Sequence, residues 1–237
     1  MLILDEKNRN SIIYKKKTTT RGWFPVEHSA EHKEKPTFSE HLRIIFHQPL
    51  QLAGEFLHKL GIKPNIITFI GLMGTLIGSV IVALGKLPLG GVVIMVMSAV
   101  DVLDGAVARA GGEPEEFGAF VDSVCDRYGE LMIFGGLLWY FIERGEFIWA
   151  GTTFIAAAGS VLVSYTRARA QSLGFEAKVG LMTRTERIMA LGPSLLFNIP
   201  FVGVLIIAVL GNITAIQRIT HVRKQAYRLR KEKEIHD

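Results

Sequence analysis

The chain has 237 residues, of which 49% are hydrophobic, and its 27 lysines and arginines outnumber its 22 acidic residues. The mean hydropathy of +0.30 and the long apolar runs argue against a soluble globular protein. The run 66–84, for example, carries no charge over a length that can cross the apolar core of a bilayer. The lone Cys125 excludes a disulfide framework and a CxxC metal site.

The first part of the chain is polar. Residues 1–38 mix charge, threonine and histidine without helical periodicity, which predicts a cytoplasmic tail without a secretory signal peptide or a zinc site. From 39 to 60, apolar side chains recur at helical spacing between charged ones. We therefore expect an amphipathic helix at the membrane surface, kinked or divided at Pro49, with packing against a soluble domain as the alternative.

Six apolar segments follow, and they predict an all-α integral membrane protein. Its transmembrane domain would cover 39–220, with six transmembrane helices preceded by the amphipathic juxtamembrane helix. The short fifth segment meets the sixth at a turn around 198–200. The predicted segments are roughly 64–84, 89–110, 117–142, 147–169, 185–199 and 200–220.

The positions of lysine and arginine predict the orientation. In a six-span topology, only Lys86 and Arg144 fall on the side opposite to all the others. The positive-inside rule then places both termini and the basic tail 221–237 in the cytoplasm, with the protein in the cell membrane. The pI near 9.3 reflects this topology and attraction to anionic lipids, so we expect no nucleic-acid partner.

Two pairs of aspartates lie in the segment 101–130, one at the end of an apolar run and one inside the next. Spacings of three and four residues place each pair on one helix face, and a Gly-Gly-Glu-Pro turn lets the pairs face each other. Four carboxylates at a membrane boundary need compensation, and their oxygens suit Mg²⁺ or Mn²⁺ better than zinc. We expect two such ions. The four residues are Asp101, Asp104, Asp122 and Asp126.

The neighbouring residues indicate that the metals would hold a diphosphate. Gly105 lies inside a helical run, where glycine costs about 1 kcal/mol relative to alanine, and close approach of a ligand to the backbone would explain it. Gly118 is interpreted in the same way. Arg109 lies on the face of Gly105 and can bind phosphate oxygens in a bidentate manner. The alternative is that the aspartates are interfacial charges paired with Arg109 and Arg127.

The spacing DxxDGxxAR, eight residues, then GxxxDxxxD resembles that of the CDP-alcohol phosphotransferases, and all eight fixed positions match. The resemblance covers roughly 40–220 and includes Lys63-Pro64-Asn65 with Thr68. It implies six transmembrane helices and a homodimer. The glycines 74 and 78 form a strip suited to close helix packing, either inside the bundle or in a dimer. The resemblance also implies that Asp126 is both a metal ligand and the general base. The residues it implies for CDP binding are Gly105, Ala108, Arg109 and Gly118, with Asp101, Asp104 and Asp122 as further metal ligands.

The loop 167–187 holds five cations and two acids, which suggests a pocket for an acceptor that carries phosphate. Membrane anchoring would explain the same charges. The pieces SYTRARA and GLMTRTER are similar, more narrowly, to phosphatidylinositol phosphate synthases, although relatives often have Lys at 167 and Glu-Arg-Pro-Glu-Arg at 183–187. This resemblance implies that Arg167, Arg187 and Arg218 hold the phosphate of inositol 1-phosphate. We expect Glu186 to pair with a nearby arginine.

We therefore predict an enzyme that transfers a phosphatidyl group, or an archaeal ether-lipid phosphoryl group, from CDP-diacylglycerol or another CDP-lipid to inositol 1-phosphate, releasing CMP. Glycerol 3-phosphate as acceptor, giving phosphatidylglycerol phosphate, is one alternative. A CDP-inositol-dependent di-inositol phosphate synthase is another. A cation-coupled transporter represents a different class. It is less favoured because the acids cluster at one membrane face and the sequence shows no internal repeat.

Overall fold

The computed structural model describes residues 51–111 and 115–236. All of them belong to one compact unit of the chain, residues 35–237. Seven of these residues are described by their backbone alone: Val102, Asp104, Glu115, Glu116, Lys233, Ile235 and His236. The predicted tail 1–38, the first half of the amphipathic helix and most of the Gly-Gly-Glu-Pro turn lie outside the described residues.

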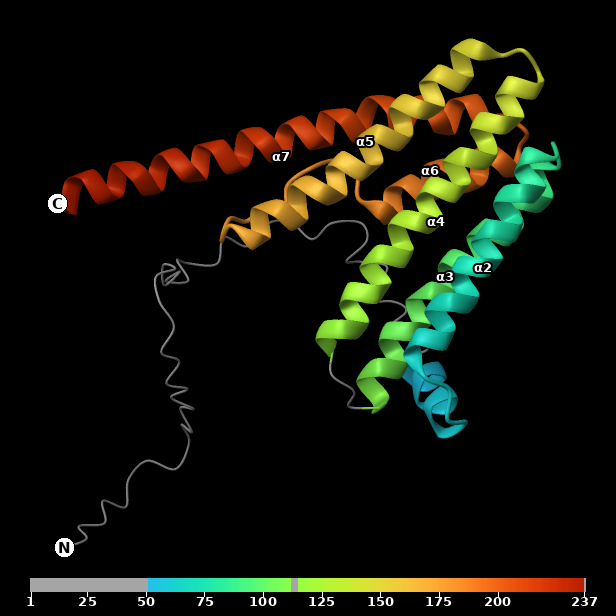
Figure 1. The fold of residues 1–237 in the computed structure, drawn as a ribbon, viewed down its shortest axis with the longest axis horizontal. Coiled ribbons are helices and arrows are strands. Elements are labelled where there is room, and N and C mark those ends of the chain that lie inside the picture. Colours follow the sequence, from blue (N-terminus) through green and yellow to red (C-terminus); the bar gives the residue numbers. More distant parts are fainter. Residues whose placement is uncertain (1–50, 112–114, 237) are drawn as a thin grey trace, which may run out of the picture. The chain divides into compact units, whose positions relative to one another are not determined.

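The described part of the chain is helical (Figure 1). A helical segment covers 51–59, the described half of the predicted amphipathic helix. Five of the six predicted segments match a helix within about three residues at both ends, whereas the last helix continues without a break through the predicted tail. In chain order the helices are α2 (Pro64–Ala83), α3 (Leu87–Gly111), α4 (Glu115–Glu143), α5 (Phe147–Ser172), α6 (Arg184–Leu196) and α7 (Pro200–His236).

Short turns with left-handed residues separate the helices at one end of the bundle. Gly85 and Gly145 follow α2 and α4 with φ values of +82° and +70°, which glycine adopts at little cost. Between α6 and α7, Asn198 has φ of 57°, and Pro200 then opens α7. The predicted turn at 198–200 is confirmed.

In the described part of the chain, four helices, α2, α3, α5 and α7, are long and apolar enough to cross a membrane. Their outer faces expose large apolar side chains, such as Ile77 at 58% and Phe154 at 68%, which suits contact with lipid. By contrast, α6 has only 13 residues and contains Pro193. At 1.5 Å per residue it spans about 20 Å, less than the roughly 30 Å apolar core of a bilayer.

Small residues bring α2 close to its neighbours α3 and α4. A Cβ atom on Gly74 would lie 2.2 Å from Met97 Sδ, and one on Gly78 would lie 2.8 Å from Ile94 Cγ1. The close helix packing predicted for this glycine strip is confirmed. Of the two uses left open, packing inside the bundle and a dimer, the structure shows the first, because the strip faces the chain's own next helix.

The remaining helices complete the bundle. α5 packs on α4 and α7, while α6 contacts both α3 and α7 (Figure 1). Fully buried apolar side chains such as Leu137, Leu195 and Ile207 form the core between them. This arrangement brings the first turn of α6 to the helices that carry the aspartates.

Candidate active site

Three of the four predicted metal ligands converge. Asp101 on α3 and Asp122 and Asp126 on α4 each offer a carboxylate oxygen, and these oxygens lie within 4.8 Å of one another. Asp101 is buried and the other two are half-buried. The side chain of Asp104 lies outside the described residues. The spacing of four residues on α4 puts Asp122 and Asp126 on one face, as predicted.

The donor set fits a hard divalent cation. Its described members are all carboxylates, which are the ligands that Mg²⁺ and Mn²⁺ take, whereas zinc sites are usually built with histidine or cysteine. Three carboxylates this close together repel one another when ionised, so the cluster needs positive charge beside it.

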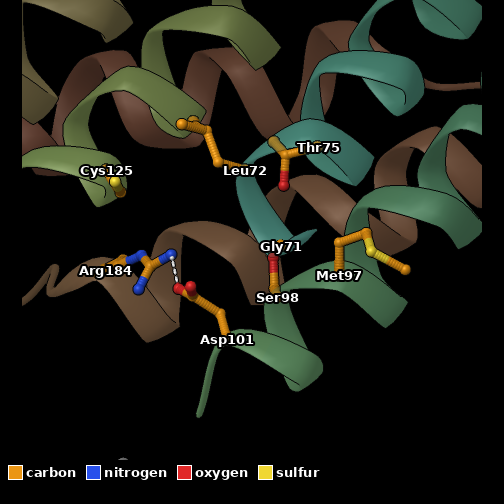
Figure 2. A pocket seen from close by; sticks show the side chains of 9 residues that line it. Gly71, Leu72, Thr75, Met97, Ser98, Asp101, Cys125 and Arg184 are labelled. Carbon is orange, nitrogen blue, oxygen red and sulfur yellow. Dashed lines mark hydrogen bonds and ion pairs between the residues drawn. The ribbon is translucent and has the colours of Figure 1, made fainter. Parts of the chain in front are cut away.

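Arginines supply part of that charge. Arg184, the first residue of α6, places Nη2 2.6 Å from Asp101 Oδ2 and Nη1 2.5 Å from Asp126 Oδ1. Figure 2 shows its guanidinium directed at Asp101 in a small pocket, which Arg184 lines together with residues of α2, α3 and α4. Arg127 contacts Asp126 Oδ2 at 3.4 Å. Sequence analysis did not single out Arg184 for this site, because Arg184 lies more than fifty residues from the aspartates in the chain.

The predicted CDP-binding residues lie on the same two helices. A Cβ on Gly105 would lie 3.3 Å from Arg109 Nη1, so the arginine extends over the glycine as the shared face predicts. Around Gly118, no heavy atom beyond its chain neighbours and its own helix backbone lies within 4 Å of a Cβ position among the described residues. Ala108 is half-buried on α3. Among the described residues, the backbone of Gly118 is therefore open to a ligand, one turn before Asp122.

A capping box determines where α6 begins. The Thr183 backbone N–H donates to Glu186 Oε2 at 2.8 Å, and the two side chains are hydrogen-bonded to each other. The box satisfies donors that the start of a helix leaves free. Glu186 was expected to pair with an arginine, but in the described structure it holds this cap instead. The cap positions Arg184 and Arg187 one turn apart on the same face.

Arg187 forms a buried ion pair with Glu130 of α4. Its Nη2 donates to Glu130 Oε2 at 3.1 Å and its Nε donates to Oε1, with side-chain exposures of 3% and 9%. The third nitrogen, Nη1, is buried and has no hydrogen-bond partner among the described residues. A buried guanidinium N–H of this kind is available to an anion. Sequence analysis missed Glu130, although it lies four residues after Asp126.

The other two predicted anion-binding arginines lie nearby. Arg167 is exposed on α5. Both Arg167 and Arg187 lie close enough to Arg218 for their positive charges to repel its guanidinium. Arg218 is buried on α7, where its Nε donates to Val179 O at 3.0 Å and its Nη1 donates to Val163 O. Arg218 therefore holds the backbone of the α5–α6 loop in addition to any role with a ligand.

Thr214, one turn before Arg218, also binds this loop. Its hydroxyl oxygen accepts hydrogen bonds from Leu181 N at 3.2 Å and from Met182 N at 3.1 Å. Further along α7, Gln225 exchanges two hydrogen bonds with the Glu176 backbone. The α5–α6 loop is thus hydrogen-bonded to α7 from Glu176 to Met182, the residue before the cap of α6.

Comparisons with known proteins identify the family that this chain resembles. The CDP-alcohol phosphatidyltransferase family model matches residues 62–217. An archaetidylinositol phosphate synthase of Pyrococcus horikoshii is 38% identical over 179 residues, which cover 75% of this chain and 93% of that protein. A phosphatidylinositol phosphate synthase of Streptomyces avermitilis is 32% identical over 207 residues, covering 81% and 85%.

Solved structures of Mycobacterium tuberculosis phosphatidylinositol phosphate synthase share the fold. The structure with CDP-DAG bound has a TM-score of 0.69 at 29% identity and covers 73% of this chain and 92% of its own. The structure in complex with manganese and citrate has a TM-score of 0.67, also at 29% identity, and covers 73% and 88%.

Proposed function

This chain belongs to the CDP-alcohol phosphatidyltransferase family, and we propose that it transfers a phosphatidyl or archaeal ether-lipid phosphoryl group from a CDP-lipid to inositol 1-phosphate. As a member of the family it is a membrane-embedded transferase of phospholipid biosynthesis. In the proposed reaction a hydroxyl oxygen of the acceptor attacks the β-phosphorus, the phosphoanhydride bond breaks and CMP leaves. The hydroxyl proton passes to a carboxylate, for which we propose Asp126.

The donor side of the proposal uses the aspartate cluster and the open backbone beside it. We propose Gly105, Ala108, Arg109 and Gly118 as CDP-binding residues, and Asp101, Asp104, Asp122 and Asp126 as ligands of two Mg²⁺ or Mn²⁺ ions. Bound cations would offset the charge of the diphosphate and of the departing CMP. The convergence of the three described carboxylates supports this assignment, as does the manganese complex of the M. tuberculosis enzyme.

The acceptor side depends on one observation above all, the buried Nη1 of Arg187. This nitrogen lacks a protein partner among the described residues, while Glu130 holds the rest of the guanidinium in place. Arg167 and Arg218 add charge to the same region. A phosphate group on the acceptor would satisfy the donor, and the names of the archaeal and bacterial relatives support inositol phosphate as that acceptor.

The membrane arrangement extends the proposal. We propose six transmembrane helices, with α4 and the short α6 completing the four long apolar ones. The site and both termini would face the cytoplasm at the cell membrane. The domain boundaries would be a tail over 1–38, the transferase domain over 39–220 and a basic segment over 221–237, in a homodimer.

Measuring CMP release from the purified protein in detergent tests the reaction. The donors are CDP-diacylglycerol, an archaeal CDP-ether lipid and CDP-inositol, and each is paired with inositol 1-phosphate, glycerol 3-phosphate or no acceptor. We expect release only with a CDP-lipid and inositol 1-phosphate. Release with glycerol 3-phosphate alone, or with CDP-inositol as the donor, would replace the proposal. Solute flux in proteoliposomes without CMP release would indicate a transporter.

A charge-matched pair of variants tests the acceptor site. Arg167→Gln removes an exposed guanidinium from the proposed pocket, and we expect the KM for inositol 1-phosphate to rise about tenfold or more, since a charge-assisted contact contributes about 1.5–3 kcal/mol. Lys178→Gln removes a charge from the same loop at a side chain that is 64% exposed and paired with Glu176. The proposal predicts little change there. An equal rise of the KM in the two variants would indicate that the positive charge of the loop attracts the acceptor at long range, without a specific pocket.

A further inference from the structure

Arg184 makes the closest contacts with the aspartate cluster of any cation in the described structure. Its Nη2 lies 2.6 Å from Oδ2 of Asp101, which belongs to α3, and its Nη1 lies 2.5 Å from Oδ1 of Asp126, which belongs to α4. These two carboxylates are 10% and 12% exposed, whereas the Arg184 side chain is 38% exposed. One guanidinium therefore joins α6 to α3 and α4 where the carboxylates meet. Figure 2 shows its contact with Asp101.

Both contacted carboxylates belong to the set that fits a divalent cation. The cluster's oxygens lie within 4.8 Å of one another, and the guanidinium is bound to two of its three described members. A divalent cation held by these oxygens would place two further positive charges next to Arg184. Like charges at such short range repel strongly, so both cannot keep these contacts at full strength.

We propose that Arg184 is the internal counter-ion of the aspartate site and that a divalent cation displaces its guanidinium from Asp101 and Asp126. The proposal rests on the metal assignment made in the proposed function. Without a cation, Arg184 offsets the repulsion among the carboxylates. With a cation, Arg184 is released into the region of substrate phosphates, one helical turn from Arg187.

The surroundings of Arg184 allow such a release. The start of α6 is held independently by the cap at Thr183 and by the buried pair of Arg187 with Glu130. Glu130 is not one of the clustered carboxylates, so cation binding leaves this second pair intact. The exposure of Arg184 gives its side chain room to move without unfolding the helix.

Manganese binding to the purified full chain in detergent tests the proposal. After removal of metal with a chelator, free Mn²⁺ is titrated and followed by electron paramagnetic resonance, and melting temperatures are measured with and without Mn²⁺. The variant is Arg184→Gln. The matched control is Arg127→Gln, which removes the same charge from an arginine that lies 3.4 Å from Asp126.

We expect Arg184→Gln to tighten the apparent Kd for Mn²⁺ at least about tenfold, because the cation no longer competes for the two carboxylates. Without metal, the Arg184→Gln variant should melt at a lower temperature than the metal-free wild type, and Mn²⁺ should restore its melting temperature. Arg127→Gln should tighten Mn²⁺ binding less than about threefold. Arg184→Lys, which keeps the charge but cannot bridge two carboxylates in the same geometry, should give an intermediate Kd and serves if the glutamine variant does not fold.

An unchanged or weaker Mn²⁺ affinity in the Arg184 variants would overturn the proposal. Equal tightening in the Arg127 variant would also overturn it, since only a long-range field would then be acting. These outcomes are separate from a failure of the proposed function. A wild type that binds Mn²⁺ and releases CMP while the variants keep its affinity rejects the displacement alone. If the wild type and the Arg184 variants all fail to bind Mn²⁺, both the metal assignment and the displacement are rejected.

Discussion

Replacing Glu130 by methionine leaves the guanidinium of Arg187 buried without its carboxylate. Side-chain exposures of 9% and 3% make this a buried ion pair, and removing one partner of such a pair costs about 3–5 kcal/mol. For a chain of this size, 1 kcal/mol shifts the melting temperature by about 2–4 °C, so we expect a decrease of about 6–20 °C. Methionine keeps most of the side-chain volume, so the effect reports the lost charge.

Two matched variants test whether the decrease in melting temperature comes from the unpaired buried charge. In the double variant Glu130→Met with Arg187→Met, no buried charge is left unpaired, and we expect most of the lost stability to return. The pair of Arg230 and Glu234 on α7 is also joined at 3.0 Å, but its side chains are 77% and 63% exposed. Glu234→Met should therefore change stability by no more than about 1 kcal/mol.

Thermal unfolding in detergent, followed by circular dichroism, measures all three variants. A Glu130→Met variant that melts within 2–3 °C, on the order of 1 kcal/mol, of the Glu234→Met variant would refute the reasoning from burial. A double variant that is less stable than the single one would show that the pair contributes mainly packing. It would also remove the argument that Glu130 holds Arg187 in position for an anion.

Further variants test the packing, the loop and the proposed base. Gly136→Ala would place a Cβ 2.3 Å from the backbone oxygen of Ser79, and we expect it to lower stability by about 1–3 kcal/mol in a thermal melt. At Gly135 a Cβ meets no heavy atom within 4 Å among the described residues, so Gly135→Ala should be neutral or slightly stabilising. Thr214→Val removes the acceptor of two backbone N–H groups, so we expect a loss of about 1–3 kcal/mol and faster hydrogen exchange at residues 181–182, and unchanged exchange there would contradict the role of the hydroxyl. Asp126→Asn should abolish CMP release while CDP-lipid still binds in an equilibrium assay, and substantial remaining turnover would rule out Asp126 as the base.

The helices and most of the aspartate site could be predicted from the sequence because both depend on local spacing. Apolar runs bounded by Gly, Pro and charged residues determine where α2 to α5 begin and end. The interval of four residues between Asp122 and Asp126 places these two side chains on one helix face before any tertiary contact is known. Local spacing also placed Arg109 over Gly105 correctly.

The partners of the charged side chains depended on the tertiary structure. Arg184 reaches Asp101 across 83 positions of the chain, and Arg187 reaches Glu130 across 57. The charge pattern of the loop 167–187 was compatible with membrane anchoring or with an anion pocket, and the sequence could not distinguish them. Likewise, the glycines of α2 could have served a dimer, and only the position of α3 shows that they pack within the chain.

What the sequence determined by itself was therefore the set of helices, their apolar faces and the carboxylates that share a face. What only the tertiary structure decided was which cation lies beside which carboxylate, and which guanidinium nitrogen remains without a partner among the described residues. The physical reason is that periodicity along one helix is a local property, whereas an ion pair between helices depends on how their axes pack, and this is set by many weak apolar contacts at once.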